Sequence, residues 1–515
     1  MRKRINSVLL AVGTAVLLIA VGCKKGTFDI NSPNPNQPST VDPKFILSAA
    51  MNSTATVVAG NPGGGSQSGN DLFNIYMGYW AVSGDYIPSA ALLQYKLTTD
   101  FGASIWDQAY PTLKNFKAIE TFYGGDASGY NYEAIAKIMQ ALIYQRLVDI
   151  YNNIPYSEAL QGGVNNSPAY DDAQTVYKDL VSQLDSSILL INSATTATKP
   201  VENDLMFGGD MDAWKIFANT LKLKILMNLT QASGGPAYIQ SELTGLTTAD
   251  FIDATFGDAT INPPYANDAN NHQTPLWSDI GSSTTGTPTT NNAYFRANSY
   301  AVTFYQNTND PRIALIYSPN SSGNVQGRAF GSTALEHNTE ISGIGGPSKG
   351  KTPTPDGLLQ SPAQPAIILS ATQSLFLQAE AVQRGYLTGD AAALYQSAIE
   401  ESFRLLGVPD YVNAAATYTA QAGDNTNFVA SSNPLETIIL QKWAALNTQD
   451  PLAAWDDWRR TGFPSDIPVS IYPGATATHI PYRLPYPTSE YNYNSANVNK
   501  EGQIDPLSSK IFWMP

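Results

Sequence analysis

Two segments of the chain combine aromatic rings with short polar side chains at close spacing. The first, residues 76–86, reads YMGYWAVSGDY, and the second spans residues 277–296. Tyr and Trp rings offer flat apolar faces with a polar handle, and amides and carboxylates hydrogen-bond to hydroxyl groups. Such groups around a concave surface could hold a sugar ring. The candidate ligand-binding residues are Tyr79, Trp80 and Asp85 in the first segment, and Trp277, Asn292 and Tyr294 in the second.

The two tryptophans of these segments have a second interpretation. Trp80 also fits a core anchor that follows a helix, and Trp277 also fits a buried anchor within a loop. Large aromatic side chains are usually well buried in folded proteins. The sequence leaves both interpretations open for each residue.

Acidic residues are numerous, but their arrangement does not single out a catalytic pair. A glycosidase needs two carboxyl groups held about 5 Å or about 6.5–9.5 Å apart. With 43 Asp and Glu in the chain, many pairs are available and none is favoured by sequence. Asp456 and Asp457 are adjacent in an aromatic setting, whereas Asp171 and Asp172 fit a helix start, where carboxylates act as caps. We therefore expect a binding protein and not an enzyme.

Metal ions, cofactors and nucleic acid are not expected as ligands. The three histidines, His272, His337 and His479, are far apart, and the chain has a single cysteine. Neither pattern matches the ligand spacing of a zinc site. The formal charge of −14 argues against nucleic acid, which is bound through clustered Lys and Arg.

The pairs Trp455/Trp458 and Arg459/Arg460 resemble a ligand clamp, but their spacing favours a structural role. Residues three apart share one helical face, so both tryptophans are predicted to pack inward. The arginines are then predicted to bond nearby carboxylates, with Asp456 or Glu490 as partners.

The N-terminus predicts export and membrane attachment. Residues 1–22 combine the positive start MRKR with a long apolar run, as in a secretory signal peptide. The run ends in small residues before Cys23, a pattern that resembles a bacterial lipobox. We expect cleavage before Cys23, lipid on that residue, and a linker over residues 23–43. A lipid anchor attaches a protein without a membrane-spanning helix.

Apolar periodicity predicts a mostly α-helical fold. Helical faces run over residues 135–150, 176–191 and 214–225, and again over 375–386, 395–406 and 434–446. Their pairing and spacing suggest tetratricopeptide-like helix pairs. We predict a single large domain, residues 44–515, with a helical scaffold at about 44–230 and 365–460. A loop-rich, ligand-binding insertion covers about 250–365, and the C-terminal segment 463–515 is irregular.

Several segments together resemble the SusD/RagB-like lipoproteins of Bacteroidetes. They are FDIN with PNPN at 28–36, residues 136–160 with PAYD at 168–171, NDPR at 309–312, residues 376–403, AWDDWRRTGFP at 454–464, and IPYRLPYPTSEYNYN at 480–494. These segments occur in the order found in the family, and the second SusD-like group is the most similar.

The resemblance implies an outer-membrane lipoprotein facing the cell exterior, built on tetratricopeptide-like helix pairs. It implies capture of oligosaccharide or polysaccharide nutrients and delivery to a SusC-like TonB-dependent transporter, without catalysis or cofactor. Two alternatives stay open within the same fold. One is a peptide ligand, and the other is a transporter subunit that binds no ligand.

Overall fold

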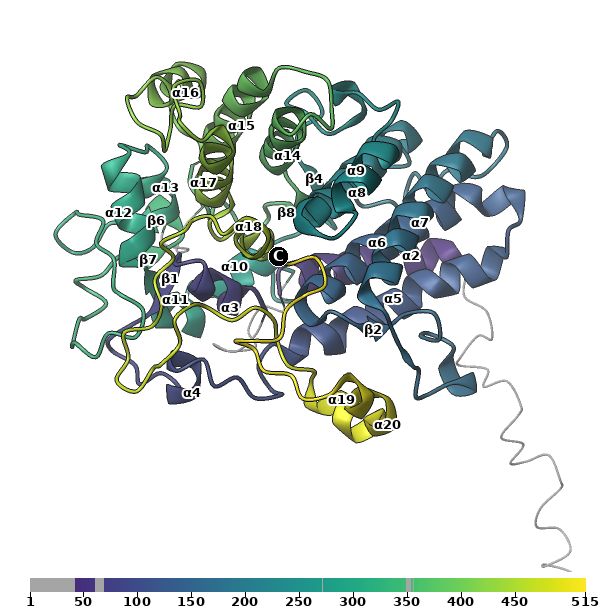
Figure 1. The fold of residues 1–515 in the computed structure, drawn as a ribbon, viewed down its shortest axis with the longest axis horizontal. Coiled ribbons are helices and arrows are strands. Elements are labelled where there is room, and N and C mark those ends of the chain that lie inside the picture. The colour runs from purple at the N-terminus through teal and green to yellow at the C-terminus, as the bar shows by residue number, and fades with distance from the viewer. Residues whose placement is uncertain (1–41, 61–68, 271, 349–352, 355) are drawn as a thin grey trace, which may run out of the picture. The chain divides into compact units, whose positions relative to one another are not determined.

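Helices make up most of the regular structure, and only short strands accompany them (Figure 1). The computed structural model describes residues 42–60, 69–270, 272–348, 353–354 and 356–515. The predicted signal peptide and Cys23 lie outside these ranges. Among the described helices, none is both long and apolar enough to cross a membrane.

The helices and strands have the following bounds. The α-helices are α2 (Pro43–Val58), α3 (Gly69–Tyr76), α4 (Ala90–Leu93), α5 (Ala103–Tyr123), α6 (Tyr130–Tyr151), α7 (Ala173–Ser193), α8 (Met211–Asn228), α9 (Gly235–Glu242), α10 (Pro275–Ile280), α11 (Thr290–Tyr294), α12 (Ser299–Asn307), α13 (Ile313–Ile316), α14 (Ala371–Gln383), α15 (Ala391–Leu406), α16 (Tyr411–Thr419), α17 (Pro434–Leu446), α18 (Pro451–Thr461), α19 (Thr488–Tyr493) and α20 (Ser495–Val498). The strands are β1 (Trp80–Val82), β2 (Ile154–Pro155), β3 (Tyr170–Asp171), β4 (Ala259–Ile261), β5 (Phe295–Ala297), β6 (Tyr317–Ser318), β7 (Gly343–Ile344) and β8 (Ala366–Leu369).

Helices that follow one another in the chain pack in pairs, which confirms the predicted mostly α, tetratricopeptide-like fold. Among the long helices, α5 contacts α6, α6 contacts α7, and α7 contacts α8; α14 contacts α15 and α17. Figure 1 shows α5–α7 in blue and α14, α15 and α17 in green, with the teal α8 between these two groups. The contact between α8 and α14 joins both halves of the scaffold.

Local sequence signals explain where these helices begin and end. Asp172 caps α7 by accepting a hydrogen bond from the Thr175 amide at 2.9 Å, as predicted for a carboxylate at a helix start. Its neighbour Asp171 lies in β3 and accepts from the amides of Tyr156 and Ser157. Gly407 ends α15 in the left-handed region, at φ 80°, where a residue without Cβ is favoured.

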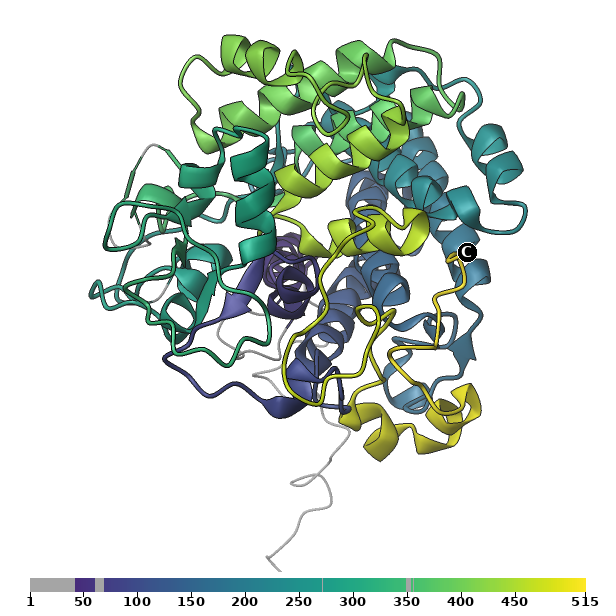
Figure 2. The same cartoon turned by 60° about the vertical axis from the view of Figure 1, so that its left-hand side comes forward.

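The segment between the two halves of the scaffold holds short helices and two-residue to four-residue strands. Each strand pair is antiparallel, and the pairs are β1 with β5, β2 with β3, β4 with β8, and β6 with β7. Figure 2 shows the part of this segment that carries α12, α13 and β5–β7, in teal, on the left of that view, away from the blue helices. Two of these pairs, β1 with β5 and β4 with β8, join the insertion to the scaffold.

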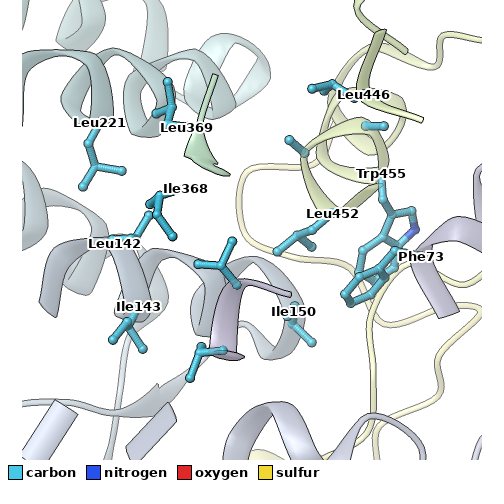
Figure 3. Close-up of a cluster of buried hydrophobic side chains, with 14 of the residues drawn as sticks. Phe73, Leu142, Ile143, Ile150, Leu221, Ile368, Leu369, Leu446, Leu452 and Trp455 are labelled. Atoms are coloured by element: carbon cyan, nitrogen blue, oxygen red, sulfur yellow. The ribbon is translucent and has the colours of Figure 1, made fainter. Parts of the chain in front are cut away.

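One hydrophobic core joins the two halves of the scaffold and β8. Figure 3 shows Leu142, Ile143 and Ile150 of α6 with Leu221 of α8, Ile368 and Leu369 of β8, and Leu446, Leu452 and Trp455 of α17 and α18. The predicted inward face of residues 135–150 is buried, with Ile135 and Ile150 both fully shielded. Burial of this apolar surface is the main stabilising contribution to such a fold.

The Trp455–Arg460 segment of α18 is structural, as its spacing predicted. Trp455 is fully buried, stacks on Phe73 with ring centroids 5.0 Å apart, and donates to the Pro481 carbonyl at 2.9 Å. Trp458 is only partly buried and stacks on Tyr482, so the inward packing holds for Trp455 more than for Trp458.

Both arginines of α18 are buried and paired with carboxylates. Arg459 bonds Asp456, and Arg460 bonds Asp457 and Glu380 of α14. The other predicted partner, Glu490, instead accepts a hydrogen bond from the Tyr170 hydroxyl at 2.7 Å.

The NDPR motif anchors the insertion to the scaffold through a buried arginine. Arg312 is fully buried and its guanidinium bonds the Asp310 carboxylate at 2.6 Å. The same group donates to Ser402 of α15 at 2.9 Å and to Gln441 of α17 at 3.0 Å. A buried charge needs such a complete set of partners, which explains the motif without any role in ligand binding.

Candidate ligand-binding surface

The pairing of β1 with β5 brings the two aromatic segments together. Trp80 lies opposite Ala297 and Val82 lies opposite Phe295. The contact continues beyond the strands, because the Ser83 amide donates to the Tyr294 carbonyl at 2.8 Å. Residues 79–86 and 292–297 thus form one local surface, although more than 200 positions separate them in the sequence.

Tyr79 and Trp80 belong to the core on the inner side of this surface. Tyr79 is fully buried, and its hydroxyl donates to the Trp443 carbonyl at 2.6 Å. Trp80 is 1% exposed and its indole NH donates to Thr448 at 2.9 Å. Buried rings offer no face to a ligand on the outer surface, so the core interpretation of Trp80 describes this structure. Trp80 also lines a partly open pocket of about 200 Å³, together with Asp279 and Thr448.

Trp277 and Asn292 hold the adjoining short helices in place. Trp277 is 2% exposed, and its indole NH donates to the Ser282 carbonyl at 3.1 Å. The Asn292 side-chain amide donates to the Ile280 carbonyl at 2.7 Å, which ties α11 to α10. The buried Trp277 ring therefore presents no face to a ligand, and the partly buried Asn292 acts as a tie between the two helices.

Asp85 and Tyr294 reach the outer surface, together with two further residues. Tyr86 is 37% exposed, and its ring lies edge-on to the half-buried Tyr294 ring, with centroids 5.3 Å apart. The exposed Asp85 carboxylate bonds His337 Nδ1 at 2.6 Å. We call Asp85, Tyr86, Tyr294 and His337 the aromatic patch.

Asn338 positions the polar half of the aromatic patch. Its amide NH donates to Asp85 at 2.8 Å, and its side-chain oxygen accepts from Ser83 at 2.6 Å and from Arg296 at 2.5 Å. Arg296 is in turn buried and donates to the Asn292 and Phe295 carbonyls. The hydrogen bonds of Asn338 with Ser83 and Arg296 therefore fix the position of the Asp85 carboxylate.

The Asp85–His337 pair is exposed, and each partner favours the charged form of the other. The Asn338 amide, and after it His337, hold the pKa of Asp85 below its ordinary value. The hydrogen bond that His337 donates to the Asp85 carboxylate raises the pKa of His337 above its ordinary value. The pair places a carboxylate and an imidazole beside two aromatic rings, and both groups can hydrogen-bond to the hydroxyl groups of a ligand.

His337 and Asn338 could not be found from the sequence. His337 is 252 residues away from Asp85, and no motif surrounds it. The only signal was that His337 lies in the predicted loop-rich insertion. The described residues contain no group of three or more His, Cys, Asp or Glu that could hold a metal ion.

Residues 345–352 match the letter patterns of two enzyme motifs. Residues 345–352 read GGPSKGKT and match the phosphate-binding pattern G-x-x-x-x-G-K-[ST], while residues 346–350 match G-x-S-x-G. Both motifs need a strand before the loop and a helix directly after it. Here the two-residue β7 precedes residues 345–352, and among the described residues no helix follows before α14. Neither match has the context that its chemistry requires.

Comparison with known proteins identifies relatives over most of the chain. Residues 35–487 match the SusD-like family model described as starch-binding and associating with the outer membrane. A chitin-binding SusD homologue from Flavobacterium johnsoniae is 22% identical, with a TM-score of 0.70 over 92% of this chain and 98% of that chain. SusD homologues from Bacteroides fragilis (20% identity, TM-score 0.70, 92% and 99% covered) and Bacteroides vulgatus (19%, 0.70, 91% and 97%) share the same fold. No curated protein sequence matches the chain.

Proposed function

The chain belongs to the SusD-like family of starch-binding proteins that associate with the outer membrane, and from this premise we propose that it captures glycan nutrients at the cell surface. We propose further that it delivers them to a partner SusC-like TonB-dependent transporter. Capture requires binding without cleavage, so incubation with the protein leaves the chain length of the glycan unchanged.

The observation that carries this proposal is the aromatic patch, which forms where residues 85–86 meet the insertion. Tyr86 and Tyr294 give two rings at the surface, and Asp85 and His337 give an acceptor and a donor next to them. The neighbouring Ile87 is fully exposed and extends the apolar part of the surface. Exposed aromatic and polar groups held on a rigid frame are the usual composition of a binding site.

Removing the Tyr86 ring is expected to weaken glycan binding. Tyr86→Ala removes one stacking face, worth roughly 1 kcal/mol, which corresponds to about fivefold in affinity. Because Tyr86 is partly exposed, the free energy of unfolding should change little. Affinity electrophoresis in gels that contain starch or soluble chitin measures the loss, and the family description and the chitin-binding relative motivate these two glycans.

The matched control is Tyr493→Ala, which removes a tyrosine that is 79% exposed on α19. It should run like the wild type in every gel. If a glycan in the gel slows Tyr86→Ala as much as it slows the wild type, the aromatic patch is not the binding surface. If no glycan retards the wild type, the peptide ligand and the transporter subunit without ligand become the better proposals.

We propose that lipid on Cys23 attaches the protein to the outer membrane. Cys23→Ala removes the acceptor of the lipid, so the protein should move from the membrane fraction to the soluble fraction and lose incorporation of labelled palmitate. Lys24→Ala leaves the cysteine in place and should behave as the wild type. Membrane retention of Cys23→Ala would contradict the lipid anchor. Digestion by protease added to intact cells tests whether residues 44–515 face the exterior. Co-purification from detergent-solubilised membranes tests whether the protein associates with a SusC-like transporter.

A further inference from the structure

A second concave surface lies between the insertion and the scaffold. A groove of about 290 Å³ opens between α12 and α17 (Figure 1), and we call it the α12 groove. Glu436 and Leu440 of α17 line one side of it. The other side is one face of α12, because its lining residues are three or four positions apart. They are Tyr300, Thr303, Phe304 and Asn307. None of the described residues that line the groove belongs to the aromatic patch.

The α12 groove follows the length of its helix. At the start of α12, the Tyr300 hydroxyl donates to the Asp466 carboxylate at 2.5 Å. Directly after α12, Thr308 lines the groove together with Asn425, whose carbonyl accepts from Gln441 of α17 at 2.9 Å. At a rise of about 1.5 Å per residue, the helix from Tyr300 to its end is about 10 Å long, so the site is elongated.

Four polar side chains of the groove are exposed and free to meet a ligand. They are Thr303, Asn307, Asn425 and Ser465. No described residue forms a hydrogen bond with any of these four side chains. Their two hydroxyls and two amides can each donate and accept. The half-buried rings of Tyr300 and Phe304 line the same groove and give it an apolar part.

The charged groups that line the α12 groove are both acidic. Asp466 is exposed and Glu436 is partly exposed, and the described lining includes no Lys, Arg or His. One Glu436 oxygen accepts from the Asn433 side chain at 3.2 Å, and no described group bonds the other oxygen. Carboxylates form charge-assisted hydrogen bonds with cations, and like charges repel. The lining therefore favours a cationic ligand over an anionic one.

We infer that the α12 groove is a second saccharide-binding site with a preference for amino sugars, an inference that rests on the proposed function. The free hydroxyls and amides match the hydroxyl groups of a sugar, and the two rings match its C–H face. The carboxylates match a protonated amino group. Selectivity against uronic acids follows from repulsion between carboxylates. A lysine-rich peptide shares the positive charge, and the experiment separates this alternative.

Isothermal titration of the full chain in a mildly acidic buffer, which keeps amino groups protonated, tests the inference. The probes are the trimers of glucosamine and of N-acetylglucosamine. Asp466→Asn and Glu436→Gln keep the shape of each side chain and remove its charge. Each should weaken binding of the glucosamine trimer about threefold to fivefold and leave the acetylated trimer nearly unchanged. Glu202→Gln is the matched control, because Glu202 is exposed between α7 and α8, outside the groove, and it should change neither titration.

Thermal unfolding without glycan separates ligand binding from a structural role. In Asp466→Asn the new amide oxygen still accepts from the Tyr300 hydroxyl, so the midpoint should equal that of the wild type. Asn307→Ala removes an exposed side chain that bonds no described residue, so it should not move the midpoint either. It should weaken the glucosamine trimer about twofold to fivefold. If Asp466→Asn does lower the midpoint, Glu436→Gln and Asn307→Ala decide the inference.

The possible outcomes distinguish this inference from the proposed function. Wild-type titrations for the double variant Asp466→Asn/Glu436→Gln would overturn the inference and leave glycan capture at the aromatic patch intact. Equal weakening of the free and the acetylated trimer would overturn the preference for amino sugars. If trilysine binds as tightly as the glucosamine trimer and loses affinity in the same variants, the groove is a peptide site and the inference is wrong. Absence of binding of any glycan to the wild type would overturn both proposals.

Discussion

Replacing Arg460 by methionine is expected to lower the free energy of unfolding by about 3–5 kcal/mol. The Arg460 guanidinium is fully buried and bonds both oxygens of Glu380, at 2.5 and 2.6 Å, and the Asp457 carboxylate at 2.6 Å. Methionine fills much of the same space but leaves two buried carboxylates without their main partner. Equilibrium unfolding in urea measures the loss.

Arg384→Met is the matched control, because Arg384 bonds the same Glu380 carboxylate at 2.8 Å from a partly exposed position. Its removal should cost about 1 kcal/mol, because Arg384 is partly exposed and Glu380 keeps Arg460 as its main partner. If Arg460→Met and Arg384→Met lower the free energy of unfolding equally, burial does not decide how much each arginine contributes through Glu380.

The Glu380–Arg460 pair also predicts how acid affects stability. Burial alone would raise the pKa of Glu380, but Arg460 and its neighbours outweigh burial and lower that pKa to about 2. A carboxyl group with a lowered pKa stabilises the fold above its ordinary pKa near 4.5, and this contribution disappears as the pH falls toward 2. The difference in stability between the wild type and Arg460→Met should therefore narrow over that range. A constant difference would contradict the pairing.

Replacing Trp443 by alanine is expected to have an effect of similar size, about 3–5 kcal/mol, because it empties a fully packed site. Trp443 of α17 is 1% exposed and stacks on Tyr79, with ring centroids 5.2 Å apart. It also contacts Phe304 and Tyr305 of α12 edge-on and face-on, respectively. Urea unfolding measures the loss, and glycan affinity should fall as well because β1 loses its support.

Trp458→Ala removes a tryptophan of the neighbouring helix that is only partly buried. It stacks on Tyr482 with centroids 5.8 Å apart and should cost about 1 kcal/mol. If Trp443→Ala lowers the free energy of unfolding no more than Trp458→Ala does, residues other than Trp443 hold the insertion to α17.

The scaffold was predictable because its signals are local. The apolar face of residues 135–150 follows the helical period and packs inward in α6, and Asp172 caps α7 as a carboxylate at a helix start should. Both features depend on residues a few positions apart. α12 is a nine-residue helix inside the insertion, and its short apolar pattern was too weak to place it.

The proposed ligand-binding surface was only partly predictable, because its residues meet through contacts between distant parts of the chain. Proximity of the 79–86 and 292–297 segments depends on the β1–β5 pairing, which no local pattern specifies. Composition alone could not separate the buried Trp80 and Trp277 from the exposed Tyr86, because an aromatic residue suits a core and a ligand site equally well. His337 joins Asp85 only through the tertiary fold.

Several side chains of the insertion bond to main-chain carbonyls of the scaffold. Tyr305 donates to the Ala444 carbonyl, Tyr317 donates to the Tyr79 carbonyl, and the Asn298 amide donates to the Trp80 carbonyl. Every residue type carries a carbonyl, so these bonds do not constrain which side chain stands at the position that accepts them. Outward-facing residues such as Tyr86 and Ile87 take no part in these bonds, so substitutions there leave the attachment in place. We expect ligand preference to change with such substitutions while the helical frame stays the same, as happens between the hypervariable loops and the framework of an antibody domain.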